Sequence, residues 1–127
     1  MAINEFRVAL TVDDFEEAAA FFQNGIGLEP GDSWTDNGTG QMFFAGNAVL
    51  EIFDPDYAKN VDKIEAGQRV SGKIRFAFEV KDVQTAIKRA LEHGGTLVHS
   101  PVTTPWGDEN ARLMSPDGLQ VTLYQPK

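Results

Sequence analysis

The stretch RFAFEVKDVQTAIKRALEHGG, Arg75 to Gly95, repeats a pattern found at RVALTVDDFEEAAAFFQNGIG, Arg7 to Gly27, which lies 68 positions earlier (75 − 7 = 68). In both copies, apolar and polar residues alternate up to an aspartate, as in a strand with one buried face. From that aspartate to the closing glycine, the apolar spacing becomes helical. The sequence therefore predicts one supersecondary unit that is used twice, with the function lying between its two copies.

The first copy predicts a strand, a helix and three more strands. Side chains alternate along Glu5–Val12, so one face of this strand meets a helix while the other, with Arg7, is left free. Asp13 is a candidate N-cap for the helix. Two Asn/Gly pairs, typical of hairpin turns, divide residues 29–54 into three short strands. We assign residues 1–54 to this first module.

The second copy predicts the same order of elements after a connector. Residues 55–72 form the connector, which we expect to be partly helical because Asp54 and Pro55 suit an N-cap and a first helical position. The second module takes residues 73–127. Its predicted elements are a strand over 73–80, a helix from Asp82 to His93, and strands over 96–104, 110–114 and 120–124.

Composition excludes several classes of protein. The chain has 127 residues, no cysteine, and 11 basic against 19 acidic residues, which gives a formal net charge of −8. That length suits one domain. Without cysteine there is no disulfide, thiol nucleophile or thiolate metal site. An acidic chain repels nucleic acid and anionic membranes, and no apolar run approaches the ~20 residues of a membrane span. We therefore expect a cytoplasmic protein whose partner is a small molecule, with no nucleic acid and no membrane.

The duplicated βαβββ plan, together with TPWG at 104–107 and SPDG at 115–118, resembles the vicinal oxygen chelate superfamily. That superfamily contains glyoxalase I, extradiol dioxygenases, fosfomycin-modifying transferases and bleomycin-resistance proteins. The resemblance covers nearly the whole chain. It implies an α+β fold in which two βαβββ modules in tandem form a curled mixed sheet with a central cleft, and it implies that the strand faces turned away from the helices line this cleft.

Four cleft positions commonly supply a metal site in the enzymes of this superfamily, and the resemblance places Arg7, Glu51, Arg75 and Thr122 there. A divalent cation needs carboxylate oxygen or neutral imidazole. An arginine stays protonated and only donates hydrogen bonds, so Glu51 alone is a plausible ligand. We therefore expect no metal and no cofactor, and metal-dependent glyoxalase or dioxygenase chemistry is disfavoured.

Arg7, Glu51 and Arg75 should project into one cavity, where the carboxylate can accept hydrogen bonds from both guanidinium groups. Two interpretations are open. The cluster is either a buried salt-bridge triad that closes the cleft, or an anion-recognising floor with one guanidinium left for a ligand carboxylate or phosphate. Glu51 is also a candidate general base, although the sequence shows no partner for it.

Several aromatic residues are not used by the helix-facing stripes and are candidates for the cleft, although aromatic residues on an inner strand face also suit a core. His99 has an undetermined facing, and one histidine without a second gives weak support for a metal. The candidate ligand-binding residues are therefore Arg7, Glu51, Arg75, Thr122, Trp34, Phe43, Trp106 and Tyr124.

These features favour a metal-independent small-molecule-binding protein, closest in character to the bleomycin-resistance branch. We expect a homodimer that sequesters an aromatic or amphoteric ligand in a shaped cleft. One alternative is a metal-dependent lyase, isomerase or dioxygenase that recruits its metal through Glu51, His99 and further ligands. A third is an accessory dimer whose cleft is filled by its own side chains. Fold kinship cannot name the ligand.

Overall fold

One mixed sheet of eight strands organises the protein, with the strand order β2-β3-β4-β1-β5-β8-β7-β6. The computed structural model describes residues 3–127; residues 1 and 2, which open the first predicted module, lie outside that range. The elements are β1 (Ile3–Thr11), α1 (Phe15–Ala20), a π-helical turn η1 (Phe21–Ile26), β2 (Glu29–Trp34), β3 (Gly40–Ala45), β4 (Ala48–Phe53), α2 (Pro55–Ala66), β5 (Ile74–Val80), α3 (Val83–Glu92), β6 (Thr96–Thr103), β7 (Glu109–Met114) and β8 (Gln120–Gln125).

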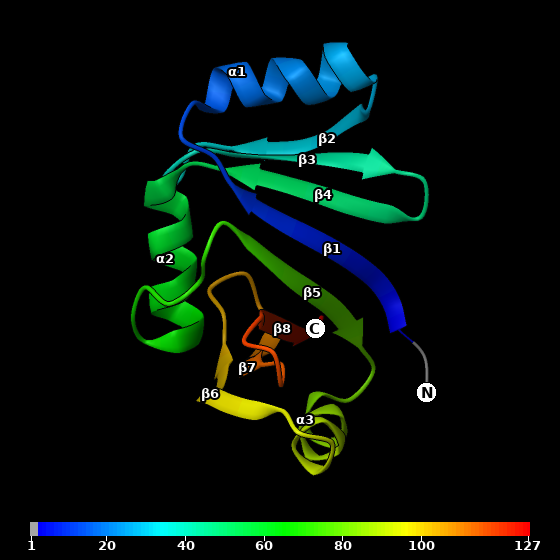
Figure 1. Ribbon diagram of the computed structural model, residues 1–127, viewed down its shortest axis with the longest axis vertical. Coiled ribbons are helices and arrows are strands. Elements are labelled where there is room, and N and C mark those ends of the chain that lie inside the picture. The colour runs from blue at the N-terminus through cyan, green and yellow to red at the C-terminus, as the bar shows by residue number, and fades with distance from the viewer. Residues whose placement is uncertain (1–2) are drawn as a thin grey trace.

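The two copies of the repeat meet at the centre of the sheet, where β1 and β5 pair antiparallel. Within each copy the first and last strands pair parallel, β1 with β4 and β5 with β8, and the remaining pairs are antiparallel. The sheet curls, so that α1 covers the first half on one side of the molecule and α3 covers the second half on the opposite side (Figure 1). This arrangement confirms the predicted α+β fold class.

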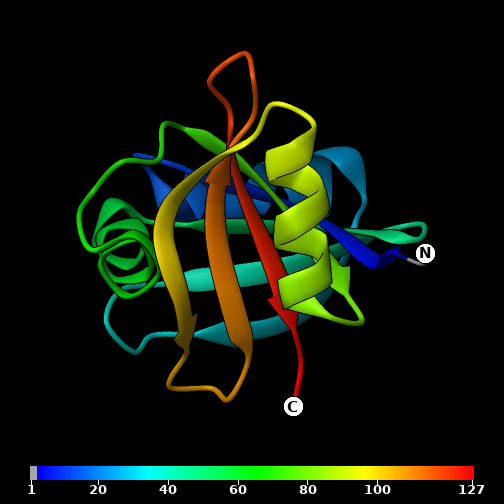
Figure 2. The same ribbon diagram turned by 90° about the horizontal axis from the view of Figure 1, so that it is seen from below.

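The alternating pattern buries one face of each half under its helix. Val12 and Ile52 form a core with α1 and η1, and Val83 of α3 forms another with Ala111 and Leu113. Figure 2 shows α3 running alongside β8, and the helix also contacts β6 and β7. The first helix begins one residue later than predicted, because Asp14 and not Asp13 is its N-cap. In both halves, the strand face that packs on the helix is therefore the core, and the opposite strand face is available to form the site.

Helix α2 belongs to the connector and touches both halves of the sheet. Asp54 caps it by accepting a hydrogen bond from the backbone N–H of Tyr57 at 2.9 Å, and Gly67 ends it with a φ of 78°. Near its start, Ala58 packs with residues of the first half, while the helix also contacts β6 and β7. Among residues 3–127, no helix is long and apolar enough to cross a membrane.

Candidate functional site

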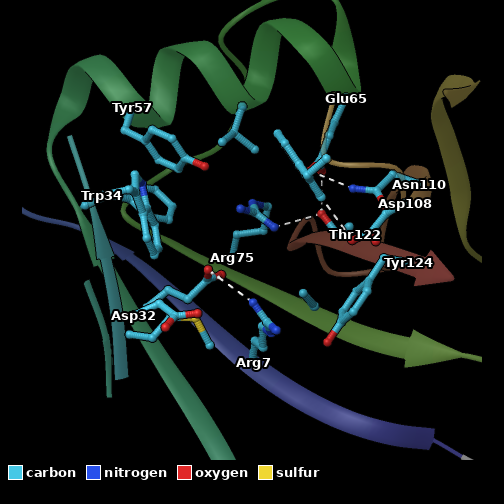
Figure 3. Close-up of a pocket in the computed structure, with 16 residues that line it drawn as sticks. Arg7, Asp32, Trp34, Tyr57, Glu65, Arg75, Asp108, Asn110, Thr122 and Tyr124 are labelled. Carbon is cyan, nitrogen blue, oxygen red and sulfur yellow. Dashed lines mark hydrogen bonds and ion pairs between the residues drawn. The ribbon is translucent and has the colours of Figure 1, made fainter. Parts of the chain in front are cut away.

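A pocket of about 410 Å³ lies between the two halves of the sheet and beneath α2. Its walls come from the strand faces that are turned away from α1 and α3, as the resemblance implies, and from α2 and the loop between β6 and β7 (Figure 3). The lining residues are Arg7, Asp32, Trp34, Met42, Glu51, Phe53, Tyr57, Val61, Glu65, Arg75, Ala77, Trp106, Asp108, Asn110, Thr122 and Tyr124.

Seven of the eight predicted site residues line this pocket, and the eighth, Phe43, lies elsewhere. Phe43 pairs with Leu50 across β3 and β4, so its side chain points to the opposite face from Glu51. There it is fully buried in the core beneath α1. The prediction for Phe43 is wrong in placement because the register of β3, which puts Met42 on the pocket side, was not fixed by the sequence pattern. That the other seven bind a ligand stays a prediction.

Arg7 is held by carboxylates on two sides. Its Nη1 lies 3.3 Å from Glu51 Oε2, and its Nε pairs with Glu5, which also accepts a hydrogen bond from the Tyr124 hydroxyl. The guanidinium carbon lies 5.4 Å from the centroid of the Tyr124 ring. Burial would lower the pKa of Arg7, but Glu51 and then Glu5 outweigh it, and the pKa lies above its ordinary value. Arg7 is therefore a satisfied cation within the pocket wall.

Arg75 is buried, with 7% of its surface exposed, and has no carboxylate ion pair among residues 3–127. Its Nη1 donates to Thr122 Oγ1 at 2.8 Å. The predicted triad, with Glu51 accepting from both arginines, is therefore wrong for Arg75. Thr122 lies opposite Ala77 in the parallel pair β5–β8, so Arg75, two residues earlier on the same face, reaches along β5 to this hydroxyl.

Glu51 lies near both guanidinium groups, yet the pKa of its carboxyl group is raised. Burial raises the pKa of its carboxyl group, and the charges of Arg7 and Arg75 only partly offset that effect. A buried carboxyl with a raised pKa is a feature of proton-transferring sites as well as of structural clusters. In this pocket Glu51 forms an ion pair with Arg7.

One end of the pocket is closed by a polar network between α2 and β7 that the sequence analysis missed. Arg112, which is fully buried, donates to Asp62 Oδ1 at 2.9 Å and to Glu65 Oε1 at 3.0 Å. Glu65 also accepts from Thr122 Oγ1 at 2.7 Å and from Asn110 Nδ2 at 2.9 Å. Two signals in the sequence point to this network: the i, i+3 spacing of the acids on α2, and the alternation of Asn110 and Arg112 on one face of β7.

An aromatic wall faces this network across the pocket. Tyr57 packs against Trp34 and Phe53, with ring centroids 5.3 Å apart in each pair. Trp34 lies directly on Gly40, where a Cβ would come within 2.2 Å of the indole Cε2, so only glycine fits there. Burial, followed by the charge of Glu51, raises the pKa of Tyr57 to about 12, so its hydroxyl stays protonated and able to donate. The wall offers a flat apolar surface with a polar tip.

Trp106 stands at the rim of the pocket, where 48% of it is exposed. Its Nε1 donates to Asp108 Oδ2 at 3.1 Å. Burial raises the pKa of Asp108 despite this hydrogen bond. His99 lies outside the pocket, with Nδ1 2.7 Å from the carbonyl oxygen of Ser100 and its ring against Gly67. The rim therefore combines an exposed ring with a carboxylate, and His99 has no part in it.

The residues at the four superfamily metal positions do not fit a divalent cation. Arg7, Glu51, Arg75 and Thr122 do converge on one pocket, but two are permanent cations and Thr122 donates its only proton to Glu65. Glu51 is already engaged by Arg7. Within the described residues, no three His, Asp or Glu side chains are placed to hold a metal ion together. The two guanidinium groups offer hydrogen-bond donors, which suit an acceptor and not a cation.

The duplicated βαβββ unit, with a pocket between its halves, places the chain in the α+β class. The chain belongs to the Glyoxalase/Bleomycin resistance protein/Dioxygenase superfamily, whose sequence model matches residues 6–123. It is 31% identical over 118 residues to the anthracycline biosynthesis protein DauV of Streptomyces sp. (strain C5), a match that covers 93% of this chain. The chain spans 40% of the length of DauV.

Solved structures of low sequence identity share the fold. A glyoxalase/bleomycin resistance protein/dioxygenase superfamily member from Vibrio splendidus 12B01 superposes with a TM-score of 0.67 at 14% identity, over 95% of this chain and 97% of that one. The methylmalonyl-CoA epimerase of Mycobacterium tuberculosis superposes with a TM-score of 0.70 at 15% identity, over 98% and 89%. At these identities the likeness concerns the fold alone.

Proposed function

We propose that this protein binds, without a metal ion, a small planar molecule that carries a carboxylate or a similar anionic group. The pocket between the two halves of the sheet is the binding site, and the protein acts by holding its ligand stoichiometrically. We further propose that it does so as a homodimer. The aromatic wall takes the flat part of the ligand, and Arg75 takes the anionic group.

The observation that carries this proposal is the state of Arg75. A buried guanidinium is expensive unless a counter-charge accompanies it, yet this one has only the hydroxyl of Thr122 as a partner among residues 3–127. Its remaining N–H groups can donate to a ligand in the planar, two-pronged geometry that suits carboxylates. A bound anion would supply the counter-charge that Arg7 receives from Glu5 and Glu51.

The shape of the pocket supports a planar ligand. Trp34 and Tyr57 form one side, Tyr124 and Trp106 stand on the other, and a volume of about 410 Å³ is within the range of small-molecule sites. DauV is named for anthracycline biosynthesis, and anthracyclines are planar polycyclic compounds, so polycyclic aromatic acids belong in a first panel of ligands.

The test is binding of 2-naphthoate and anthraquinone-2-carboxylate, measured by quenching of tryptophan fluorescence and by calorimetry, beside their neutral carboxamides. We expect the acids to bind more tightly. Arg75→Met should weaken the acids by about 10- to 100-fold, since a charge-assisted hydrogen bond contributes ~1.5–3 kcal/mol, and should affect the carboxamides much less. Lys88→Met removes the same charge from the exposed surface of α3 and is the matched control.

Three outcomes would argue against the proposal. Acids that bind no tighter than millimolar would favour the filled-cleft alternative. Stoichiometric metal, detected by native mass spectrometry together with the oligomeric state, would contradict metal independence. Conversion of a bound acid to a new product, followed by ¹H NMR, would favour an enzyme, with Glu51 as the first candidate for the base because burial raises its pKa.

A further inference from the structure

The carboxylate of Glu65 fixes the direction of several hydrogen bonds at one end of the pocket. It is buried, and it accepts from Thr122 Oγ1 at 2.7 Å, Arg112 Nη2 at 3.0 Å and Asn110 Nδ2 at 2.9 Å. An ionised carboxylate can only accept hydrogen bonds. Each of these three neighbours must therefore turn a donor toward Glu65. Any acceptor atom on the same side chain then points away from Glu65.

The consequence for Asn110 is a buried acceptor without a donor. Its amide nitrogen is committed to Glu65, so the orientation of the amide is set by chemistry and Oδ1 is the atom turned away. Asn110 is a lining residue of the pocket with only 3% of its surface exposed, and Oδ1 is buried with no hydrogen-bond partner in residues 3–127. A buried amide oxygen left unpaired destabilises the protein, and such atoms are rare.

The same carboxylate also determines how Thr122 contacts Arg75. Thr122 has one hydroxyl proton, which it donates to Glu65, so its oxygen accepts from Arg75 Nη1 at 2.8 Å. Glu65 thus maintains two unlike groups in one pocket: donors on Arg75 and an acceptor on Asn110. Neither Asn110 nor Glu65 was among the candidate residues from the sequence.

We infer that Asn110 Oδ1 accepts a hydrogen bond from a hydroxyl or amino group of the bound ligand, so that the pocket selects a planar molecule with a donor group in addition to its anionic group. The inference rests on the proposed function, because it uses the same pocket. Glu65 is a positioning residue, because it acts by orienting the amide of Asn110.

The first experiment compares 2-naphthoate with its monohydroxy positional isomers and their methoxy counterparts by calorimetry. We expect at least one hydroxynaphthoate to bind about 10-fold more tightly than 2-naphthoate. Its methoxy counterpart, which cannot donate a hydrogen bond, should lose that gain. Asn110→Leu, which keeps the size of the side chain but removes the acceptor, should bind the hydroxy and parent acids equally.

The second experiment reverses the polarity of the site with Glu65→Gln. The amide oxygen at position 65 would still accept from Thr122 and Arg112, so its NH₂ group must face Asn110 and donate to Oδ1. The amide of Asn110 then rotates and presents Nδ2 to the pocket. We expect the preference for the hydroxy acid over its methoxy counterpart to be lost, because a hydroxyl oxygen and a methoxy oxygen can both accept from Nδ2. A merely structural role of Glu65 would weaken both acids alike.

The outcomes separate this inference from the proposed function. If 2-naphthoate binds but no hydroxy isomer binds more tightly, or if Asn110→Leu keeps the preference, the inference is overturned while the proposed function stands. If none of the acids binds, both are overturned. Should circular dichroism show that a variant is unfolded, the hydroxy and methoxy acids on the wild-type protein decide alone.

Discussion

Two arginines that occupy corresponding positions in the repeat have unlike surroundings. Arg7 pairs with Glu5 and Glu51, whereas Arg75 has no carboxylate ion pair in the described part of the chain. The residue that corresponds to Glu5 is Lys73 (5 + 68 = 73), so the second copy of the strand does not bring a carboxylate to its arginine. Thr122 pairs with Ala77 as Glu51 pairs with Ala9, so the second copy also has a hydroxyl where the first has a carboxylate. These two differences leave Arg75 without a carboxylate ion pair among residues 3–127.

The stability of Glu51 variants tests how this asymmetry is maintained. Arg7 keeps Glu5 when Glu51 is lost, so Glu51→Gln, which retains an acceptor oxygen, should unfold within about 1 kcal/mol of the wild type at pH 7. Glu51→Ala should lose more, ~2–3 kcal/mol, since it also leaves a cavity. Thermal denaturation measures both. A loss above ~3 kcal/mol for Glu51→Gln, typical of a broken buried ion pair, would show that Arg7 depends on the charge of Glu51.

The difference in stability between Glu51→Gln and the wild type should depend on pH, and the sign of this dependence follows from the pKa of Glu51. Burial raises the pKa of Glu51 in the folded protein above its ordinary 4.5, so the folded state binds the proton more tightly than the unfolded state. The associated stabilisation is present below pH 4.5 and is lost as the pH rises through the folded pKa. The stability of Glu51→Gln relative to the wild type should therefore increase between pH 4 and pH 7.

At the scale of elements, α2 does more than connect two modules. Its N-terminal half supplies Tyr57 to the aromatic wall, and its C-terminal half supplies Glu65 to the polar network. Between them, Asp62 accepts from Arg112, from Arg69, from the hydroxyl of Ser71 and from backbone N–H groups of residues 70 and 71. Asp62 thus joins both the helix and the segment that follows it to β7, in addition to the hydrogen bonds that Glu65 accepts from β7.

Asp62 should make the fold sensitive to acid. Burial alone would raise its pKa, but the hydrogen bonds from Ser71 and the pairing with Arg112 outweigh burial and hold the pKa below the ordinary 3.8. The folded state then binds fewer protons, so this stabilisation is present above pH 3.8 and is lost as the pH falls below it. Asp62→Asn should cost about 3 kcal/mol at pH 7, and its deficit against the wild type should shrink below pH 4.

Thermal unfolding of both proteins between pH 2.5 and pH 7 measures this effect. Asp56→Asn, at an exposed position in the first turn of the same helix, is the control and should track the wild type throughout. A deficit of Asp62→Asn that stays constant down to pH 2.5 would contradict the lowered pKa.

At the scale of the molecule, the sequence predicted the elements that follow a repeating pattern, and it missed the strand register and the long-range side-chain contacts. The change from strand to helix spacing after Val12 and Val80 predicted the repeated order of elements, and the resemblance to the superfamily implied the curled sheet. The strand spacing also placed Arg7 and Arg75 in the pocket, since alternation decides facing. The register of β3 was not encoded by alternation alone, and Phe43 was misplaced. The partners of Arg112 lie 47 and 50 residues away, so the local spacing on α2 and β7 identifies candidate polar groups but does not pair them.

The continuous sheet implies that the two halves unfold together although their elements repeat. β1 and β5 pair over seven residue pairs from Ile3↔Val80 to Leu10↔Ile74, and Phe6 of β1 packs on Phe76 and Phe78 of β5. Neither half can leave without exposing this seam, and α2 adds contacts to both. Such coupling favours a single cooperative transition.

Each half carries one tryptophan, which makes the expectation testable. Trp106→Phe leaves Trp34 as a reporter of the first half, and Trp34→Phe leaves Trp106 as a reporter of the second. In each variant we expect the fluorescence midpoint on heating to coincide with the midpoint from circular dichroism, which reports the whole chain. Adding Phe6→Ala between β1 and β5 should lower the free energy of unfolding by ~3 kcal/mol, and both midpoints should fall together by roughly 10 °C. Weakening the pairing of β1 with β5 must affect both halves if they unfold together. If the substitution shifted the midpoint of only one reporter, the two halves would be separate folding units, and the pocket would lie at the contact between two domains.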